Sequence, residues 1–491
     1  MVIAHSRGNP PVSSNSLKRD RNQLTIDDFS IPFGGKLNAE NRWVKMAEVM
    51  PWDLVEEIYA EKFKSDNIEG RPPITSRMAF GALYIKEHEN FPQDRTMQHI
   101  SENVYMQHFI GLTEFSPNPP FDSSMLSRMA ARFSKEDMDR INEELYRRTH
   151  PPKDEPPSDD GGGDGNKGRL ILDATAAPAD IRYPTDVSLL NECREGTEKI
   201  IDDVWDKTDR NGHKTAYNRK KARKGYLKIA KQRKPRRKQV RQAVREQLEC
   251  VEKNVEALEG ILAMIGLEAF GLPNWARLLT ISEIAAQQRS HYDNPSEPIP
   301  NRIVSVRQPH VRPIVRGKAG SEVEFGQKIS LSIVDGYTFI EEQSWNNFAE
   351  GITLIASVEK YRERHGAYPE AVLADKTYRN RENLDYCKMR GIRLSGPRLG
   401  RPKSSEIEVN RNQAYRDSCE RNMIEGRIGI GKQRYGLDRI YARLTNTGEL
   451  EAAMNVLCMN VVHVLRNLLR LLFQRLIWTY SGRFYARCAD N

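Results

Sequence analysis

The sequence predicts a mixed α/β fold, preceded by helices and interrupted by a helical insertion. Three observations predict it. Apolar residues recur at helical spacing from Asn41 to Phe133, strand-like segments cluster between 302 and 395, and a highly charged helical stretch separates the first strand from the others. The chain has 491 residues, which corresponds to about three domains, each large enough to bury a core.

The N-terminal third is predicted to be helical after a flexible tail. Residues 1–38 are polar and rich in Pro and Ser, and we expect them to form the tail. Residues 39–150 are expected to form a compact helical domain, with a helix-turn-helix arrangement, which is typical of DNA-binding domains, as one alternative. The stretch PPKDEPPSDDGGGDGNKG is too rich in Pro, Gly and Asp to pack, so residues 151–168 are predicted to be a linker.

The remaining chain alternates strand and helix signals. Asp335-Gly336 between alternating apolar segments predicts a β-hairpin, EVEFGQKISLSIV followed by YTFIEEQSW. The other strand-like segments are RLILDATA (169–176), RIVSVR (302–307), AVLAD (371–375) and GIRLS (391–395). Antiparallel strands followed by parallel strands with crossover helices match a sheet of the RNase H type. We expect its core over 169–194 and 300–448, a helical insertion over 195–299 and a C-terminal helix over 449–491.

The positive charge of the chain lies in one segment. The formal net charge is +9, and Arg210–Arg241 contains fifteen Lys and Arg with no acid. Without these fifteen, 61 of the 76 cations remain against 67 anions, a net charge of −6. A run this pure favours a polyanion as partner, so we predict contact with DNA phosphates, for example through Arg233, Lys234, Arg236, Arg237 and Lys238. Tyr217 and Tyr226 could stack or bond to phosphates there. A solvated helical arm is the alternative.

The sequence contains neither a strong membrane signal nor a cysteine framework. The longest apolar run without charge, Ala452–Leu465, is shorter than the roughly 20 residues a bilayer helix needs, and no secretory signal is expected. We therefore expect a cytoplasmic, nucleoid-associated protein without a membrane partner. The six cysteines contain no CxxC pair, so no zinc site or disulfide is predicted.

Three carboxylates fall at the ends of predicted elements. Asp173 is expected to close the first strand, Asp375 to close the fourth, and Glu425 to lie on the helix after the last strand. A single strand-end Asp is more often a turn or cap residue, but the first and fourth strands of such a sheet are neighbours. Three oxygen ligands suit Mg²⁺ or Mn²⁺, and two such ions would clamp a phosphodiester during in-line displacement.

Cations accompany Glu425 on its predicted helix. Arg421 and Lys432 share a helical face with Glu425, where they could hold phosphates or simply be solvated. The nearby glycines at 426, 429 and 431 weaken a helix, so it could bend or end there, or the DNA backbone could approach closely.

These motifs resemble those of bacterial DDE transposases of the IS-Five and IS-Four insertion-sequence type. The segments are LILDATAAPADIRYPTD with Asp173, AVLADKTYRNREN with Asp375, and RNMIEGRIGIGKQRYGLDRI with Glu425. Upstream, GRPPITSRMAFGALYIKEHENFPQDRTMQHISENVYMQHFIGL and FDSSMLSRMAARF are similar to the helical N-terminal domain of these enzymes. The resemblance covers about residues 40 to 475.

The resemblance implies an activity and roles for residues. It implies cleavage at the ends of a mobile element and joining of the 3′-OH to target DNA, with Asp173, Asp375 and Glu425 as metal ligands. Arg421 and Lys432 match the Arg and Lys of the Tyr-Arg-Glu-Lys signature, whose Tyr is here Ser418, so another residue such as Tyr435 would have to replace it. Terminal inverted repeats and target DNA are the implied partners, and two element ends suggest a homodimer or higher assembly on DNA.

Two other functions remain open at the level of sequence. A metal nuclease of the same fold would cut DNA without strand transfer. A domesticated DNA-binding protein would bind DNA without catalysis, although all three acids are present.

Overall fold

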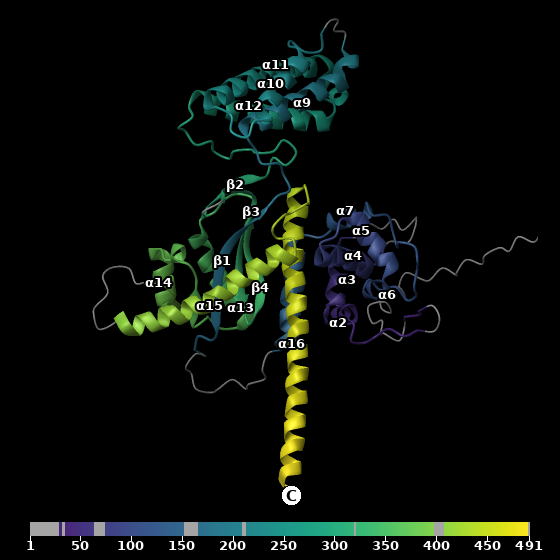
Figure 1. Cartoon of the computed structure of the whole chain (residues 1–491), viewed down its shortest axis with the longest axis vertical. Helices are drawn as coiled ribbons and strands as arrows, with labels where there is room; N and C mark the ends of the chain where they lie inside the picture. The colour runs from purple at the N-terminus through teal and green to yellow at the C-terminus, as the bar shows by residue number, and fades with distance from the viewer. Residues whose placement is uncertain are drawn as a thin grey trace, which may run out of the picture.

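The computed structural model describes residues 29–31, 35–62, 74–151, 165–208, 213–318, 321–396 and 407–489. Figure 1 shows a central sheet, a helical body made from the chain between 186 and 293 beyond one end of it, and N-terminal helices to its side. A long helix, α16 (Thr445–Ala489), runs between the N-terminal helices and the sheet (Figure 1).

The N-terminal part is helical, as predicted. Its helices are α2 (Arg42–Val49), α3 (Trp52–Glu61), α4 (Ser76–Glu89), α5 (Gln93–Glu102), α6 (Val104–Phe109), α7 (Met125–Ala130) and α8 (Lys135–Thr149). Polar side chains start several of them: Asn41 and Thr75 accept hydrogen bonds from the first turns of α2 and α4, and Ser134 with Asp137 forms a capping box on α8. Trp52 packs edge to face on both Phe80 and Phe109, which fixes α3 against α4 and α6.

The sheet is mixed, as predicted. Its strands in the described residues are β1 (Arg169–Pro178), β2 (Arg312–Lys318), β3 (Ser321–Val334), β4 (Tyr337–Ser344), β5 (Ala371–Leu373) and β6 (Arg393–Leu394). β3 pairs antiparallel with β1 on one edge and with β2 and β4 on the other. β5 runs parallel to β1, and β6 parallel to β5. The predicted adjacency of the strands that lead to Asp173 and Asp375 is confirmed.

The predicted hairpin is confirmed, and one predicted strand is wrong. Asp335 (φ 51°) and Gly336 (φ 84°) both have positive φ, as the tight turn between β3 and β4 requires. RIVSVR (302–307) is irregular, and the strand β2 begins only at Arg312. Ile303 and Val304 are buried in different clusters, one within the helical insertion and one beside the sheet, so these residues pack between the two parts and do not pair with a strand.

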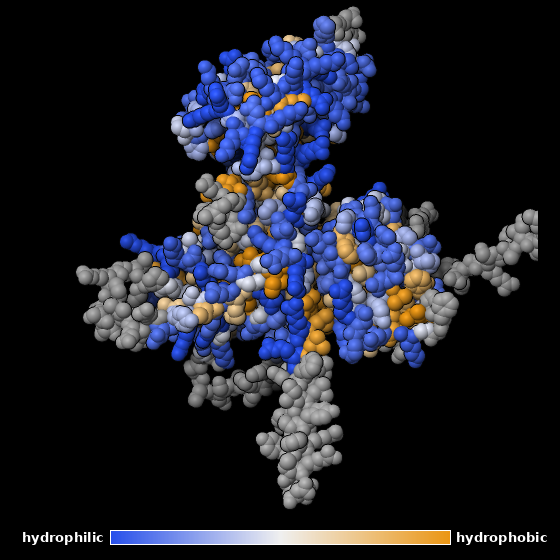
Figure 2. Space-filling model, in the orientation of Figure 1, coloured by the Kyte–Doolittle hydropathy of each residue, from blue (hydrophilic) through white to orange (hydrophobic). Residues whose placement is uncertain are grey.

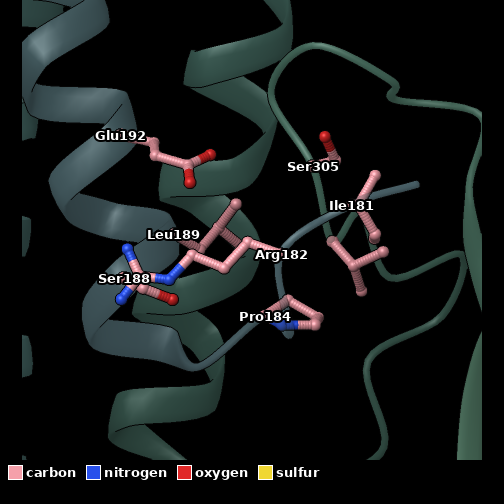
Figure 3. Close-up of a pocket in the computed structure, with 8 residues that line it drawn as sticks. Ile181, Arg182, Pro184, Ser188, Leu189, Glu192 and Ser305 are labelled. Atoms are coloured by element: carbon pink, nitrogen blue, oxygen red, sulfur yellow. The ribbon is translucent and has the colours of Figure 1, made fainter. Parts of the chain in front are cut away.

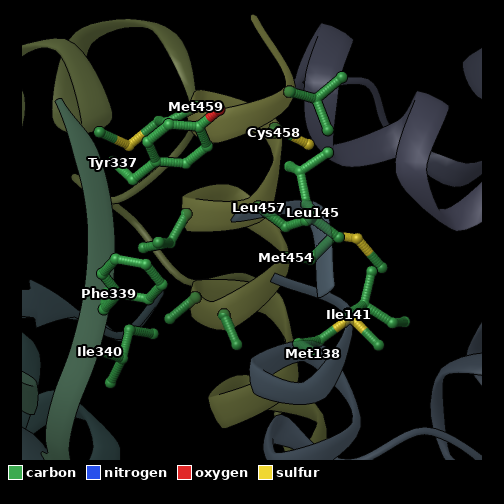
Figure 4. Packing of buried hydrophobic residues seen from close by; sticks show 14 of the residues in the cluster. Met138, Ile141, Leu145, Tyr337, Phe339, Ile340, Met454, Leu457, Cys458 and Met459 are labelled. Atoms are coloured by element: carbon green, nitrogen blue, oxygen red, sulfur yellow. The ribbon is translucent and has the colours of Figure 1, made fainter. Parts of the chain in front are cut away.

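One hydrophobic core joins the N-terminal helices, the sheet and α16. Figure 4 shows Met454, Leu457 and Cys458 of α16 between residues of α8 and the aromatic face of β4. The helices α13 (Leu354–His365), α14 (Arg381–Met389) and α15 (Ile407–Arg434) complete this part of the fold. In the described chain, the segment Thr445–Arg470 is long and apolar enough to cross a membrane, but 61% of its apolar window is buried in the protein. Core helices commonly have this composition.

The insertion has its own core and a hydrophilic surface. Its helices are α9 (Asp186–Val204), α10 (Arg219–Ala230), α11 (Arg237–Phe270) and α12 (Leu272–Asp293), and Figure 2 shows that their visible surface is mostly hydrophilic. The fully buried Arg194 donates to Gln247 at 3.0 Å and pairs with Glu198, which ties α9 to α11. Thr185 caps α9, and Asp186 in the first turn of this helix pairs with Arg302.

Candidate functional site

Asp173 and Asp375 both follow the carboxyl end of the parallel pairing between β1 and β5. In the register of β1 and β5, Ile171 is opposite Leu373. Asp173 and Asp375 each follow two residues later, just beyond the last pair of β1 with β5. Each carboxylate also accepts a hydrogen bond from the next backbone N–H, Ala174 at 2.8 Å and Lys376 at 2.6 Å.

The prediction that Asp173 ends its strand is wrong. β1 continues to Pro178, and Asp173 remains opposite Leu331 of β3. Only the pairing with β5 stops before it, because β5 ends at Leu373. Asp173 therefore stands where β1 loses one of its two neighbours, which frees space for a side chain beside Asp375.

Arg421 of α15 contacts both Glu425 and Asp375. The guanidinium of Arg421 lies 3.5 Å from Glu425 Oε1, four residues along the helix, and 3.6 Å from Asp375 Oδ1. The carboxylates of Asp375 and Glu425 are 43% and 56% exposed, so a large ligand could reach both. The structure thus brings Asp173, Asp375, Glu425 and Arg421 together.

Asp173 is the most sheltered of the three acids. Burial raises its pKa above the ordinary value of 3.8, and the nearby carboxylates of Glu350 and Glu425 act in the same direction. The Ala174 N–H and the Arg421 guanidinium oppose this shift by stabilising the ionised form. The site therefore concentrates negative charge, with Arg421 as a nearby cation. Glu350 was not predicted from the sequence.

The chemistry of these side chains fits a hard divalent cation, because all three offer carboxylate oxygens. Among the described residues, however, no three His, Cys, Asp or Glu side chains are close enough together to hold a metal ion. The guanidinium of Arg421 supplies the positive charge between Asp375 and Glu425.

Ion pairs fix α15 across the sheet. Asp417 is buried and receives two bonds from Arg393 of β6, at 2.5 and 3.0 Å. Glu420 pairs with Arg169 at the start of β1. These pairs hold the segment before Glu425 against two strands, whereas the helix itself has few apolar residues to pack.

The glycines after Glu425 do not end the helix, which continues to Arg434. A Cβ at Gly426 or Gly429 would meet no atom within 4 Å, but at Gly431 it would lie 2.7 Å from Leu437 Cδ1. A side chain at Gly431 would therefore have to displace the buried Leu437 side chain. Lys432 lies near β3, with its Nζ 3.9 Å from Glu324 Oε2.

Tyr435, suggested above as a replacement for the tyrosine expected at position 418, is buried. It is only 7% exposed, and its ring packs against His88 of α4. Ser418 is exposed on α15. Tyr415, one turn earlier on the same helix, is 72% exposed and was not singled out from the sequence.

The basic residues of the insertion form a separate surface. Arg233, Lys234, Arg236, Arg237 and Lys238 are all exposed, at the junction of α10 and α11. Lys220, Lys224 and Lys228 are also exposed and recur every four residues along one face of α10. The structure does not bring these residues to the three acids, which lie on the sheet and α15 (Figure 1).

The hydroxyls of Tyr217 and Tyr226, suggested above to bond to DNA phosphates, bond to protein side chains instead. Tyr226 is buried and accepts a hydrogen bond from Arg182 at 2.9 Å. The hydroxyl of Tyr217 donates to Glu198 at 2.7 Å and accepts from Asn254. Both tyrosines therefore stabilise the insertion.

A small pocket lies where the insertion joins the sheet. Figure 3 shows its lining, which includes Arg182 and Pro184 from the segment that leads into α9, Glu192 of α9, and Ser305. Its lining includes none of the three acids. We regard it as part of the junction between the two parts and not as the catalytic site.

Comparisons with known proteins identify two segments. A family model described as Transposase DDE domain matches residues 372–462, which contain Asp375 and Glu425. A family model described as Transposase domain (DUF772) matches residues 32–132, in the N-terminal helices. No curated protein and no solved structure matches the chain. One transposase model matches around two of the three acids and a second matches the N-terminal helices, and together these two matches support an insertion-sequence DDE transposase.

Proposed function

We propose that this transposase cuts DNA at the ends of its mobile element and joins the freed 3′-OH to target DNA. Asp173, Asp375 and Glu425 would be the metal-binding catalytic residues on an RNase H-like sheet. The observation that carries the proposal is the convergence of these acids, from two adjacent parallel strands and one helix, around Arg421.

Both chemical steps are phosphoryl transfers without a covalent enzyme intermediate. In the first, water attacks a phosphodiester at the element end, and the bond to the 3′ oxygen breaks to release a 3′-OH. In the second, this hydroxyl attacks a target phosphodiester, and a target 3′-OH leaves. Two Mg²⁺ or Mn²⁺ ions bound by the carboxylates would lower the pKa of the attacking hydroxyl and stabilise the negative charge on the phosphate.

The protein side chains would bind and orient the DNA strand. Arg421 would exchange its contacts with Asp375 and Glu425 for the phosphate, since a guanidinium binds phosphate oxygens in bidentate geometry. Lys432, seven residues after Glu425, would hold the strand further along. The exposed cations of the insertion would grip the element end or the target through its phosphates, without reading sequence.

We propose a homodimer or larger assembly on DNA, because two element ends need two active sites. The setting would be the nucleoid in the cytoplasm. The domain roles would follow the predicted boundaries, with a DNA-binding domain over 39–150 and a catalytic core over 169–194 and 300–448.

The test uses the full chain, a labelled duplex with the terminal repeats of its element, a target plasmid and Mg²⁺. Joined products are expected. Asp173→Asn, Asp375→Asn and Glu425→Gln should each abolish cleavage while retaining end binding, and the exposed Asp385 of α14 offers a matched control, Asp385→Asn. Cleavage without joining would identify a nuclease, and binding without cleavage by the unmodified chain would identify a non-catalytic DNA-binding protein.

A further inference from the structure

Glu350 is a fourth carboxylate beside the proposed site, with a partner for each oxygen. It begins a short 3₁₀ turn, η4 (Glu350–Thr353), between β4 and α13. Its Oε1 lies 3.1 Å from Lys328 Nζ, and its Oε2 accepts a hydrogen bond from the Thr377 hydroxyl at 3.3 Å. The carboxylate thus connects a strand of the sheet to the turn that follows Asp375.

Lys328 gives this carboxylate a fixed position. It lies on β3 opposite Ala176 of β1, and its side chain is only 11% exposed. Its ammonium donates to the Phe348 carbonyl at 2.9 Å and lies 5.1 Å from the centre of the Phe348 ring. A charge this sheltered requires a counter-ion, which Glu350 provides.

The turn after Asp375 is pressed against the turn of Glu350. Asp375 caps the short helix η5 (Lys376–Tyr378), so the position of this helix fixes the carboxylate of Asp375. A Cβ at Gly351 would lie 2.8 Å from the Thr377 carbonyl oxygen, too close for any side chain. Asn383 bonds to the Gly351 and Tyr378 carbonyls at 2.7 and 2.8 Å, which joins the two turns.

The charge of Glu350 also acts on Asp173. Among the charged neighbours that perturb Asp173, Glu350 has the largest effect, and it raises the pKa of Asp173. Glu350 and Asp173 both raise the pKa of the buried Tyr378 hydroxyl, which places the three groups in one neighbourhood. This agrees with the contacts described above.

We propose that Lys328 and Glu350 are a positioning pair for the carboxylate site: Lys328 holds Glu350, and Glu350 holds the turn of Asp375 through Thr377. The inference rests on the proposed catalytic role of Asp375. Because both oxygens of Glu350 already have protein partners, we assign it a positioning role and not that of a fourth metal ligand.

The sharpest test changes Thr377, because this residue is exposed and its substitution should not unfold the protein. Thr377→Val removes the hydroxyl at nearly constant volume, and Thr377→Ser keeps it. With saturating DNA we expect cleavage by Thr377→Val to fall by about 10- to 100-fold, the usual effect of losing a partner that orients a ligand, with recovery in Thr377→Ser. DNA affinity should not change.

A second measurement reports on the metal site without turnover. Mn²⁺ binding to the full chain, followed by electron paramagnetic resonance, should weaken in Thr377→Val and Glu350→Gln. It should remain unchanged in Glu342→Gln, which alters an exposed carboxylate on β4. A role confined to stability would lower the melting temperature without changing Mn²⁺ affinity.

The pair itself is tested by a double-mutant cycle of Lys328→Met and Glu350→Gln. We expect the double variant to cleave faster than Lys328→Met alone, which leaves Glu350 without its cation beside Asp173. Two results would overturn the positioning role. One is that the effects of Lys328→Met and Glu350→Gln on cleavage simply add in the double variant, and the other is that Thr377→Val and Thr377→Ser cleave equally fast. If the unmodified chain does not cleave, the proposed function fails instead, so the two failures are distinguishable.

Discussion

Neutralising the basic junction of α10 and α11 should flatten the salt dependence of DNA binding. The change is Arg233→Gln, Lys234→Gln, Arg236→Gln, Arg237→Gln and Lys238→Gln in one protein. All five side chains are exposed, and none forms an ion pair with another described residue. Their charge is therefore available to phosphates.

The magnitude follows from counterion release. Each duplex phosphate contact contributes about 0.9 to the slope of log affinity against log salt concentration, so five contacts contribute about 4.5. Between about 50 and 200 mM salt, the affinity of the unmodified chain should fall roughly 500-fold more than that of the variant. The assay is fluorescence anisotropy with a labelled duplex over a series of salt concentrations.

A control variant changes cations that already have an acidic partner. Lys214 and Arg219 lie 3.5 and 2.8 Å from Asp202, so Lys214→Gln with Arg219→Gln should change the slope less per residue. An unchanged slope in the five-residue variant, with an unchanged circular dichroism spectrum, would refute the reasoning. The basic segment would then be a solvated arm.

Three further predictions concern the catalytic part. Asp173→Asn should stabilise the protein at neutral pH, because burial raises the pKa of Asp173 in the folded state. In the unmodified chain, the stability that the protonated carboxyl contributes is fully present below the ordinary pKa of 3.8 and is lost as the pH rises through the raised pKa of the folded state. The Asn side chain carries no charge, so the variant does not lose this stability. In urea unfolding, the gain in the free energy of unfolding of Asp173→Asn over the unmodified chain should grow from about pH 4 and then level off. An equal gain at pH 3 would contradict this prediction. Gly426→Ala should stabilise by about 1 kcal/mol, since its Cβ meets open space, and Gly431→Ala should destabilise by about 1–3 kcal/mol. Calorimetry measures the change in stability of each variant. Changes of the same sign in Gly426→Ala and Gly431→Ala would contradict the prediction. Asp417→Asn should cost about 1–3 kcal/mol in urea unfolding by weakening the pair with Arg393, and a smaller loss in Arg393→Lys provides the comparison.

Local patterns were sufficient for much of the fold. Asp335-Gly336 predicted the hairpin because a tight turn with two positive φ angles depends on those two residues and their flanking alternation. The order of strands predicted that Asp173 and Asp375 leave adjacent strands, since connection rules limit how such a sheet can be arranged. The charge count located the basic surface without any knowledge of the fold.

Other features depended on contacts between distant residues. RIVSVR has the composition of a strand, but its apolar residues are buried between the insertion and the sheet. Tyr217, Tyr226 and Tyr435 could have faced DNA by sequence alone, but hydrogen bonds and burial direct them into the protein.

By itself, the sequence determined which residue types are present for the proposed chemistry: three carboxylates with accompanying cations, and a separate basic segment. Only the tertiary structure decided which groups surround those carboxylates. Lys328 and Glu350 are 22 positions apart and Thr377 follows 27 later, yet they meet beside Asp173 and Asp375. No local pattern encodes such a meeting, because it depends on how the strand β3 and the turns η4 and η5 pack together.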